Sequence, residues 1–172
     1  MISPQIRRAA ELGLIDPDRV AVLGHSHGWY AVGALLAESD LFQAGVSLMG
    51  LFDLSAMYCN ANGAEYAFLS GQMRMGVPLW DDPERYRRNS PHHQAKNIDA
   101  PLLLIAGELD RAAPWYESDK MWNALRTLGK TAEIAIYPGE DHDLGEWSPA
   151  NRLDACERVL RFLEQNLSAQ GH

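Results

Sequence analysis

The most constraining feature of this sequence is an apolar run that contains no polar residue, Pro101-Leu102-Leu103-Leu104-Ile105-Ala106. A strand with one face in water alternates apolar and polar residues, whereas a strand that is apolar on both faces is covered on both faces. Further strands are predicted over 19–23, 43–49 and 132–137. The run therefore indicates a parallel sheet with a layer of helices on each side.

Helical segments alternate with these strands. Residues 30–36 follow the first strand, and a later helix opens at Pro114 and ends at Gly129. A final helix follows Ser148-Pro149, and its predicted apolar stripe comprises Leu153, Cys156, Val159, Leu160, Leu163 and Leu167. This alternation predicts an α/β fold. Residues 51–97 lack it, and we expect them to form an irregular helical insertion over the end of the sheet that carries the candidate active site.

Composition excludes several classes of protein. The chain has 172 residues, which suits one domain, and its hydrophobic content of 47% supports a buried core rather than disorder. Its formal charge of −8 argues against a nucleic-acid partner. No apolar run approaches a membrane span or a secretion signal. Cys59 and Cys156 are the only cysteines, which favours a reducing compartment, so we expect a cytoplasmic protein with no membrane partner.

A Gly-x-Ser-x-Gly motif, Gly24-His25-Ser26-His27-Gly28, lies between the first predicted strand and the helix that follows it. In this position the motif forms a sharp turn that lifts the serine hydroxyl clear of the sheet, and its glycines let strand and helix approach closely. Ser26 is therefore the candidate nucleophile. The alternative interpretation is a tight strand-to-helix turn with a serine cap.

A serine hydroxyl is a weak nucleophile unless a base takes its proton and an acceptor orients that base. Asp110 follows the strand at 101–106, and His142 follows the strand at 132–137. Loops at the carboxyl ends of parallel strands converge at one edge of the sheet, so both side chains are predicted to meet Ser26. The chain order of serine, acid and histidine is that of the α/β-hydrolase fold.

Other aspartates compete for the role of the acid. Asp53 also follows a predicted strand, the one at 43–49, and is the alternative to Asp110. Asp141 and Asp143 flank His142 too closely in the chain to reach its ring easily. We expect these two residues to tune the charge of the site or to lie at the surface.

Several histidines suggest a metal site, but the pattern does not support one. His25 and His27 flank the serine, yet residues at these positions of the turn point apart, and no cysteine or carboxylate completes a ligand set. His92-His93 is expected to be exposed helix surface. We predict no metal and no cofactor.

The oxyanion that forms when a carbonyl is attacked needs preorganised hydrogen-bond donors. The backbone N–H of His27, directly after the nucleophile, is the first candidate donor. The second donor normally comes from a loop upstream of the turn, and the 25 residues before Ser26 leave no room for that loop. The source of the second donor is therefore open.

From these residues onward, the chain resembles the catalytic domain of the prolyl oligopeptidase family of serine peptidases, including its acylaminoacyl-peptidase-like and dipeptidyl-peptidase-like members. Beyond the triad, the matching segments are Ile15-Asp16-Pro17-Asp18-Arg19-Val20-Ala21, Trp80-Asp81-Asp82-Pro83, Ser90-Pro91, Pro101-Leu102-Leu103-Leu104-Ile105 and Tyr137-Pro138-Gly139-Glu140. The resemblance implies a single, partial α/β-hydrolase domain over 1–172, truncated on its N-terminal side. It implies Ser26 as nucleophile, Asp110 as acid and His142 as base.

The chain departs from the family pattern in several ways. Trp29 stands in the place of a second glycine, where its bulk is expected to crowd the turn or reshape the leaving-group side. The family's β-propeller and the first strands of its hydrolase sheet have no counterpart. Phe52, Tyr58 and Tyr66 align weakly with the aromatic residues of the family's acyl-side pocket and are candidate substrate-binding residues.

The missing strands have a physical consequence. In this fold the strand that leads into the serine turn is central, so losing its upstream neighbours exposes the backbone edge of Val20–Leu23. We expect a homo-oligomer or a separately encoded N-terminal partner to cover this edge strand, 20–23. Two functions are then possible. The chain is a serine hydrolase of small esters or short peptides, or it is an inactive fragment or non-catalytic subunit that needs an N-terminal half.

Overall fold

Four parallel strands form the sheet in the order β1-β2-β3-β4. The strands are β1 (Ala21–His25), β2 (Ala44–Leu48), β3 (Leu102–Gly107) and β4 (Ala132–Tyr137). In the register, Val46 of β2 pairs with Leu23 on one side and with Leu103 on the other. This computed structural model describes residues 2–60 and 73–167, and it confirms the parallel sheet.

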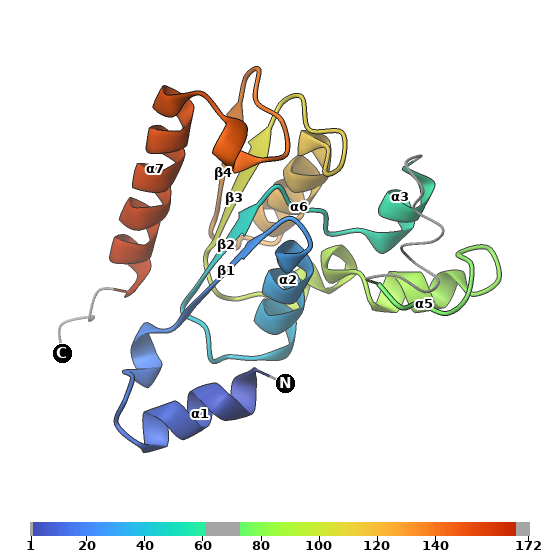
Figure 1. Cartoon of the computed structure of the whole chain (residues 1–172). Coiled ribbons are helices and arrows are strands. Elements are labelled where there is room, and N and C mark those ends of the chain that lie inside the picture. Colours follow the sequence, from blue (N-terminus) through green and yellow to red (C-terminus); the bar gives the residue numbers. More distant parts are fainter. Residues whose placement is uncertain (1, 61–72, 168–172) are drawn as a thin grey trace.

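Helices cover both faces of the sheet (Figure 1). The helices α2 (Gly28–Glu38) and α6 (Trp115–Thr127) lie on one face, where α2 packs on β1 and β2 and α6 packs on β3 and β4. The last helix, α7 (Pro149–Leu167), lies on the other face against β2 and β3. Every residue of β2 and β3 is buried, as expected for strands with helices on both sides. The architecture is an α/β-hydrolase-type parallel sheet with helices on both faces.

Short elements complete the described part of the chain. They are α1 (Ser3–Glu11), η1 (Pro17–Arg19), α3 (Leu54–Cys59), α5 (Pro83–Arg88), η2 (Pro91–Asn97) and η3 (Leu144–Glu146). The helices α3 and α5 pack on each other beyond the α2–α6 layer, and η2 packs on α2, α5 and α6 (Figure 1). No helix within the described ranges has the length and apolarity needed to cross a membrane.

The strand β1 begins two residues later than the sequence predicts and extends to the residue before Ser26. Asp16 accepts a hydrogen bond from the amide of Asp18 at 3.0 Å, which begins the 3-10 turn η1. Arg19 therefore belongs to this turn, and its Nε donates to the carbonyl of Leu167 at 2.8 Å. Because β1 runs on to His25, the sheet itself sets the position of the serine turn.

The predicted apolar stripe of α7 is only partly buried. The residues that face the sheet most fully are Ala155 and Phe162, whereas Leu153 and Leu160 are 60% and 61% exposed. On a second apolar side of the helix, Val159 and Leu160 lie beside Leu23 of the edge strand β1, which is 52% exposed. A hollow of ≈ 260 Å³ lies there, lined by Leu23, Leu48, Leu144, Ala155, Cys156, Val159 and Leu160.

Leu103 and Leu160 offer a matched pair of truncations. Leu103→Ala removes a fully buried side chain from β3, so it should lower the free energy of unfolding by about 2–5 kcal/mol. Leu160→Ala, on the exposed side of α7, should change it by less than about 0.5 kcal/mol. Urea unfolding followed by circular dichroism measures both. Equal losses would show that the exposed side of α7 is covered in solution.

Candidate active site

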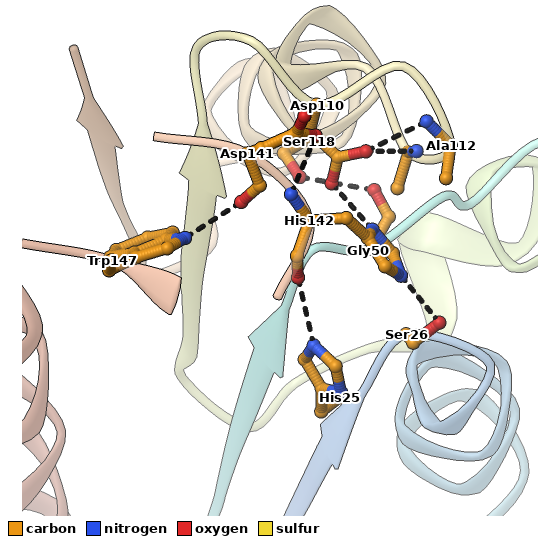
Figure 2. Close-up of polar contacts among 10 residues, drawn as sticks. His25, Ser26, Gly50, Asp110, Ala112, Ser118, Asp141, His142 and Trp147 are labelled. Atoms are coloured by element: carbon orange, nitrogen blue, oxygen red, sulfur yellow. Dashed lines mark hydrogen bonds and ion pairs between the residues drawn. The ribbon is translucent and has the colours of Figure 1, made fainter. Parts of the chain in front are cut away.

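The loops that follow β1, β3 and β4 meet at the carboxyl edge of the sheet (Figure 2). They carry Ser26, Asp110 and His142 respectively. These side chains come from positions far apart in the sequence, and parallel strands bring their carboxyl ends to one side. The structure thus places the three candidate catalytic residues together.

The backbone at Ser26 is strained in the way that the motif predicts. Ser26 has a φ of +50°, in the left-handed region, and its amide donates to the carbonyl of Leu48 on β2 at 3.0 Å. A Cβ on Gly24 would lie 2.3 Å from the carbonyl oxygen of Gly28, so only glycine fits at position 24. A Cβ on Gly28 would meet nothing within 4 Å. The close approach of strand and helix therefore depends on the first glycine alone.

A chain of hydrogen bonds joins the three side chains (Figure 2). His142 Nε2 lies 2.8 Å from Ser26 Oγ, and His142 Nδ1 lies 2.7 Å from Asp110 Oδ2. An ionised carboxylate only accepts hydrogen bonds, so Nδ1 carries the ring proton and Nε2 accepts from the serine hydroxyl. In this tautomer the imidazole is ready to take the proton of Ser26.

Asp110 is fixed through both of its oxygens. Its Oδ1 accepts hydrogen bonds from the amides of Ala112 at 2.8 Å and Ala113 at 2.7 Å, which leaves Oδ2 for His142. The Asp110 side chain has an exposed fraction of 0%. A buried carboxylate stays charged only when hydrogen bonds replace its water. The loop after β3 supplies these bonds and orients the anion toward the imidazole.

The surroundings of His142 raise its pKa above the ordinary value of 6.5. The largest cause is the hydrogen bond to Asp110, and burial of the ring opposes it. The charges of Asp110, Asp141 and Asp143 raise the pKa further, which is the tuning effect expected of the two flanking aspartates. The neutral, proton-accepting imidazole therefore predominates only at a higher pH than in a free histidine.

The loop that carries His142 is held in place by contacts that the sequence does not predict. The Glu140 carboxylate accepts from the amide and the hydroxyl of Ser148 at 3.0 and 2.7 Å, and Trp147 Nε1 donates to the carbonyl of Asp141 at 2.7 Å. A Cβ on Gly107 would lie 2.5 Å from the Glu140 carbonyl oxygen, so the loop passes directly over the end of β3. Polar loop residues carry no sequence signal that separates such contacts from solvent exposure.

The histidines weighed as metal ligands have other neighbours. His25 Nε2 lies 3.2 Å from the carbonyl oxygen of His142. His92 and His93 lie on η2, with their rings edge to face at 5.6 Å. Over residues 2–60 and 73–167, no group of three or more His, Cys, Asp or Glu residues is arranged to hold a metal ion.

Asp53 serves as a helix cap. Its Oδ1 accepts hydrogen bonds from the amides of Ser55 at 2.9 Å and Ala56 at 3.3 Å at the start of α3. Asp141 turns to the amide of His142, at 2.7 Å, rather than to its ring. Of the aspartates considered, Asp110 is the one whose carboxylate contacts the imidazole.

The aromatic residues named as candidate substrate contacts differ in exposure. Phe52 is 1% exposed, and its ring packs edge to face on Trp29, with the centroids 5.7 Å apart. Trp29 is itself 2% exposed, so its bulk is directed into the core rather than over the turn. Tyr58 is half-buried and packs edge to face on Tyr86. Tyr66 lies outside the described residues.

The backbone amide of His27 is the N–H next to Ser26, the candidate nucleophile. His27 directly precedes α2, so its amide belongs to the positive end of that helix. It donates to no acceptor in the part of the chain that the structure describes, whereas the amide of Trp29 returns to the carbonyl of Ser26 at 2.9 Å. The His27 N–H is thus available to a ligand beside Ser26.

Known proteins are similar to this chain in fold or in sequence. An acylaminoacyl peptidase of Pyrococcus horikoshii matches with a TM-score of 0.85 and 28% identity, over 96% of this chain and 27% of its own. A puromycin-hydrolyzing peptidase of Mycobacterium tuberculosis gives a TM-score of 0.83 and 26% identity, over 95% and 24%. Dipeptidyl-peptidase 5 of Porphyromonas gingivalis is 30% identical over 133 residues, which are 74% of this chain and 19% of that protein. The chain therefore spans between 19% and 27% of the length of these relatives.

The sequence model of the prolyl oligopeptidase family matches residues 5–170, nearly the whole chain. The two solved peptidases compared above have the same α/β sheet, and the resemblance to this family is confirmed. This chain belongs to the prolyl oligopeptidase family.

Proposed function

We propose that this chain is a serine hydrolase that cleaves small esters or short peptides through an acyl-enzyme. The observation that carries the proposal is the unbroken hydrogen-bond chain from Asp110 through His142 to Ser26, with distances of 2.7 and 2.8 Å. A nucleophile, a base and an orienting acid in contact are the minimum set for this chemistry. Membership of a peptidase family supports the same reaction class.

In the proposed reaction, Ser26 Oγ attacks the substrate carbonyl carbon while His142 Nε2 takes its proton. Asp110 stabilises the imidazolium that forms and keeps the ring in place. His142 then returns the proton to the leaving amine or alcohol, and the acyl group remains on Ser26. Water releases the acyl group by the same steps, with His142 again as the base.

The His27 N–H is the proposed first donor to the oxyanion. Its position next to Ser26 and at the start of α2 supports this role. We propose that a second donor comes from another segment or from a partner. Esters make a smaller demand on the oxyanion site than amides do, so we propose them as the substrates on which this chain alone is most active.

The alternative is that the chain is a non-catalytic portion that needs an N-terminal half. The observation that favours it is the share of its relatives that the chain spans, at most 27% in the three compared above. The alternative differs from the first proposal in one measurable way. The purified chain alone would be inactive, and an added upstream segment would restore turnover.

The exposed apolar side of α7 and the edge of β1 support a further proposal about partners. A second copy of the chain, or an N-terminal partner, would cover the edge strand 20–23 together with Leu23, Leu153 and Leu160. Light scattering of the chain alone at micromolar concentration should then give a mass above that of one chain. Adding an N-terminal partner that covers the same edge should prevent this self-association. A stable, well-behaved monomer would contradict self-association.

The proposed compartment is the cytoplasm. Cys59 and Cys156 are both free and exposed, which suits a reducing environment. The acidic composition, with a formal charge of −8, supports a partner set without nucleic acid.

Ser26→Ala gives the first test of the mechanism. The unaltered chain should react with a fluorophosphonate probe and hydrolyse a p-nitrophenyl ester, because the probe and the ester both need an activated serine. Ser26→Ala should abolish both signals, and Ser55→Ala on α3 should leave them unchanged. Probe labelling that persists in Ser26→Ala would identify another nucleophile. No reaction from the unaltered chain until an upstream segment is added would favour the alternative function.

Asp110→Asn tests the role of the acid. The asparagine Oδ1 keeps the bonds to Ala112 and Ala113, while its NH₂ group faces His142 Nδ1 and imposes the wrong tautomer. Turnover of the ester should fall by about 10³–10⁴-fold.

In the unaltered chain, activity should be lost as the pH falls through a value above 6.5, since the raised pKa makes His142 cationic there. A flat profile between about pH 5 and 8 would contradict a histidine base.

A further inference from the structure

Three consecutive carbonyls in the loop that carries His142 each accept a hydrogen bond from a different residue. The Glu140 carbonyl accepts from the amide of Leu109 at 2.8 Å, and the Asp141 carbonyl accepts from Trp147 Nε1 at 2.7 Å. The His142 carbonyl is 3.2 Å from His25 Nε2. A carbonyl oxygen only accepts, so His25 Nε2 carries a proton in this contact.

The third of these bonds differs from the other two in what it connects. Leu109 follows β3, and Trp147 lies in the same loop as Asp141, so neither contact relates the loop to the nucleophile. His25 is the last residue of β1 and the neighbour of Ser26. Among the described residues, it provides the one hydrogen bond between β1 and the main chain of the loop that follows β4.

The sheet order makes this connection important. The strands β1 and β4 lie at opposite edges of the sheet, with β2 and β3 between them. The loop after β4 must therefore reach across two strands to bring His142 to Ser26. The contact of 2.8 Å between Nε2 and Oγ depends on how far the loop reaches, and a shift of about 1 Å in such a contact is costly to catalysis.

We propose that His25 is a positioning residue for the base: adjacent residues of the serine turn hold both ends of His142, Ser26 at the ring and His25 at the backbone carbonyl (Figure 2). The inference rests on the proposed hydrolase function. His25 acts here only as a hydrogen-bond donor from an exposed side chain. The bond to the His142 carbonyl therefore affects the position of His142 and not its charge. The rings of His25 and His142 are tilted by 41° with centroids 5.4 Å apart, so ring stacking does not replace the bond.

Two substitutions separate the hydrogen bond from the shape of the ring. His25→Phe keeps an aromatic ring beside His142 but removes the donor. His25→Gln places an amide NH₂ near the position of Nε2 and restores a donor without the ring. His93→Phe, at an exposed histidine on η2, is the matched control.

The first measurement does not need turnover. In the full chain, the proton between His142 Nδ1 and Asp110 Oδ2 should give a far-downfield NMR signal, because a short, charge-assisted hydrogen bond deshields the proton that it holds. The signal should broaden or vanish in His25→Phe, return in His25→Gln and stay unchanged in His93→Phe. The second measurement is hydrolysis of p-nitrophenyl acetate. In His25→Phe, kcat should fall by about threefold to tenfold with KM unchanged, as for one exposed hydrogen bond that acts on the transition state, and His25→Gln should recover it.

The outcomes separate this inference from the proposed function. A signal in the unaltered chain that survives His25→Phe would overturn the role of His25 and leave the triad intact. Loss in both His25→Phe and His25→Gln would also overturn it, because the donor would then not be what matters. No signal in the unaltered chain would count against the triad arrangement itself, and the inference would fall with it.

Discussion

The hydrogen bond between Ser26 and His142 joins the two edge strands of the sheet, and the rest of the site depends on it. The strands that carry these residues are separated by β2 and β3, so the bond forms only because the loop after β4 crosses the end of β3. The loop can approach the end of β3 this closely because residue 107 is a glycine and has no side chain. Its course is then maintained by contacts to consecutive carbonyls, from Leu109, Trp147 and His25. The position of the His142 ring therefore depends on three loops together.

The buried carboxylate of Asp110 uses its two oxygens for different hydrogen bonds. One oxygen is occupied by two backbone amides of its own loop, and the other is directed at the imidazole. Because the carboxylate is buried away from water, its charge is stabilised by hydrogen-bond donors in fixed positions rather than by mobile solvent. The same hydrogen bond that orients His142 raises its pKa, so orientation and basicity have one physical cause.

The scaffold around the site has one side that the described residues leave open. The last helix presents apolar residues both to the sheet and to the edge of β1, and only the first set is buried. The relatives of this chain are several times longer. A partner surface at this edge would act close to the serine turn, because His25 and Ser26 directly continue the strand that it would cover.

The sequence by itself determined the four strands to within two residues at each end, the serine turn and the chain order of the residues that meet it. A fully apolar run admits few structures besides a covered strand, and Gly24 is required wherever a strand and a helix approach this closely. Other features were decided only by the tertiary structure. Asp53 and Asp110 each follow a strand, and the choice between them depends on which carboxylate caps a helix and which faces the imidazole. The bond of His25 to the His142 carbonyl joins residues 117 positions apart, and the exposed side of α7 depends on which strand edge lies beside it. The local pattern of apolar and polar residues indicates which face of a helix or strand is apolar. It does not indicate which distant backbone group that helix or strand will contact.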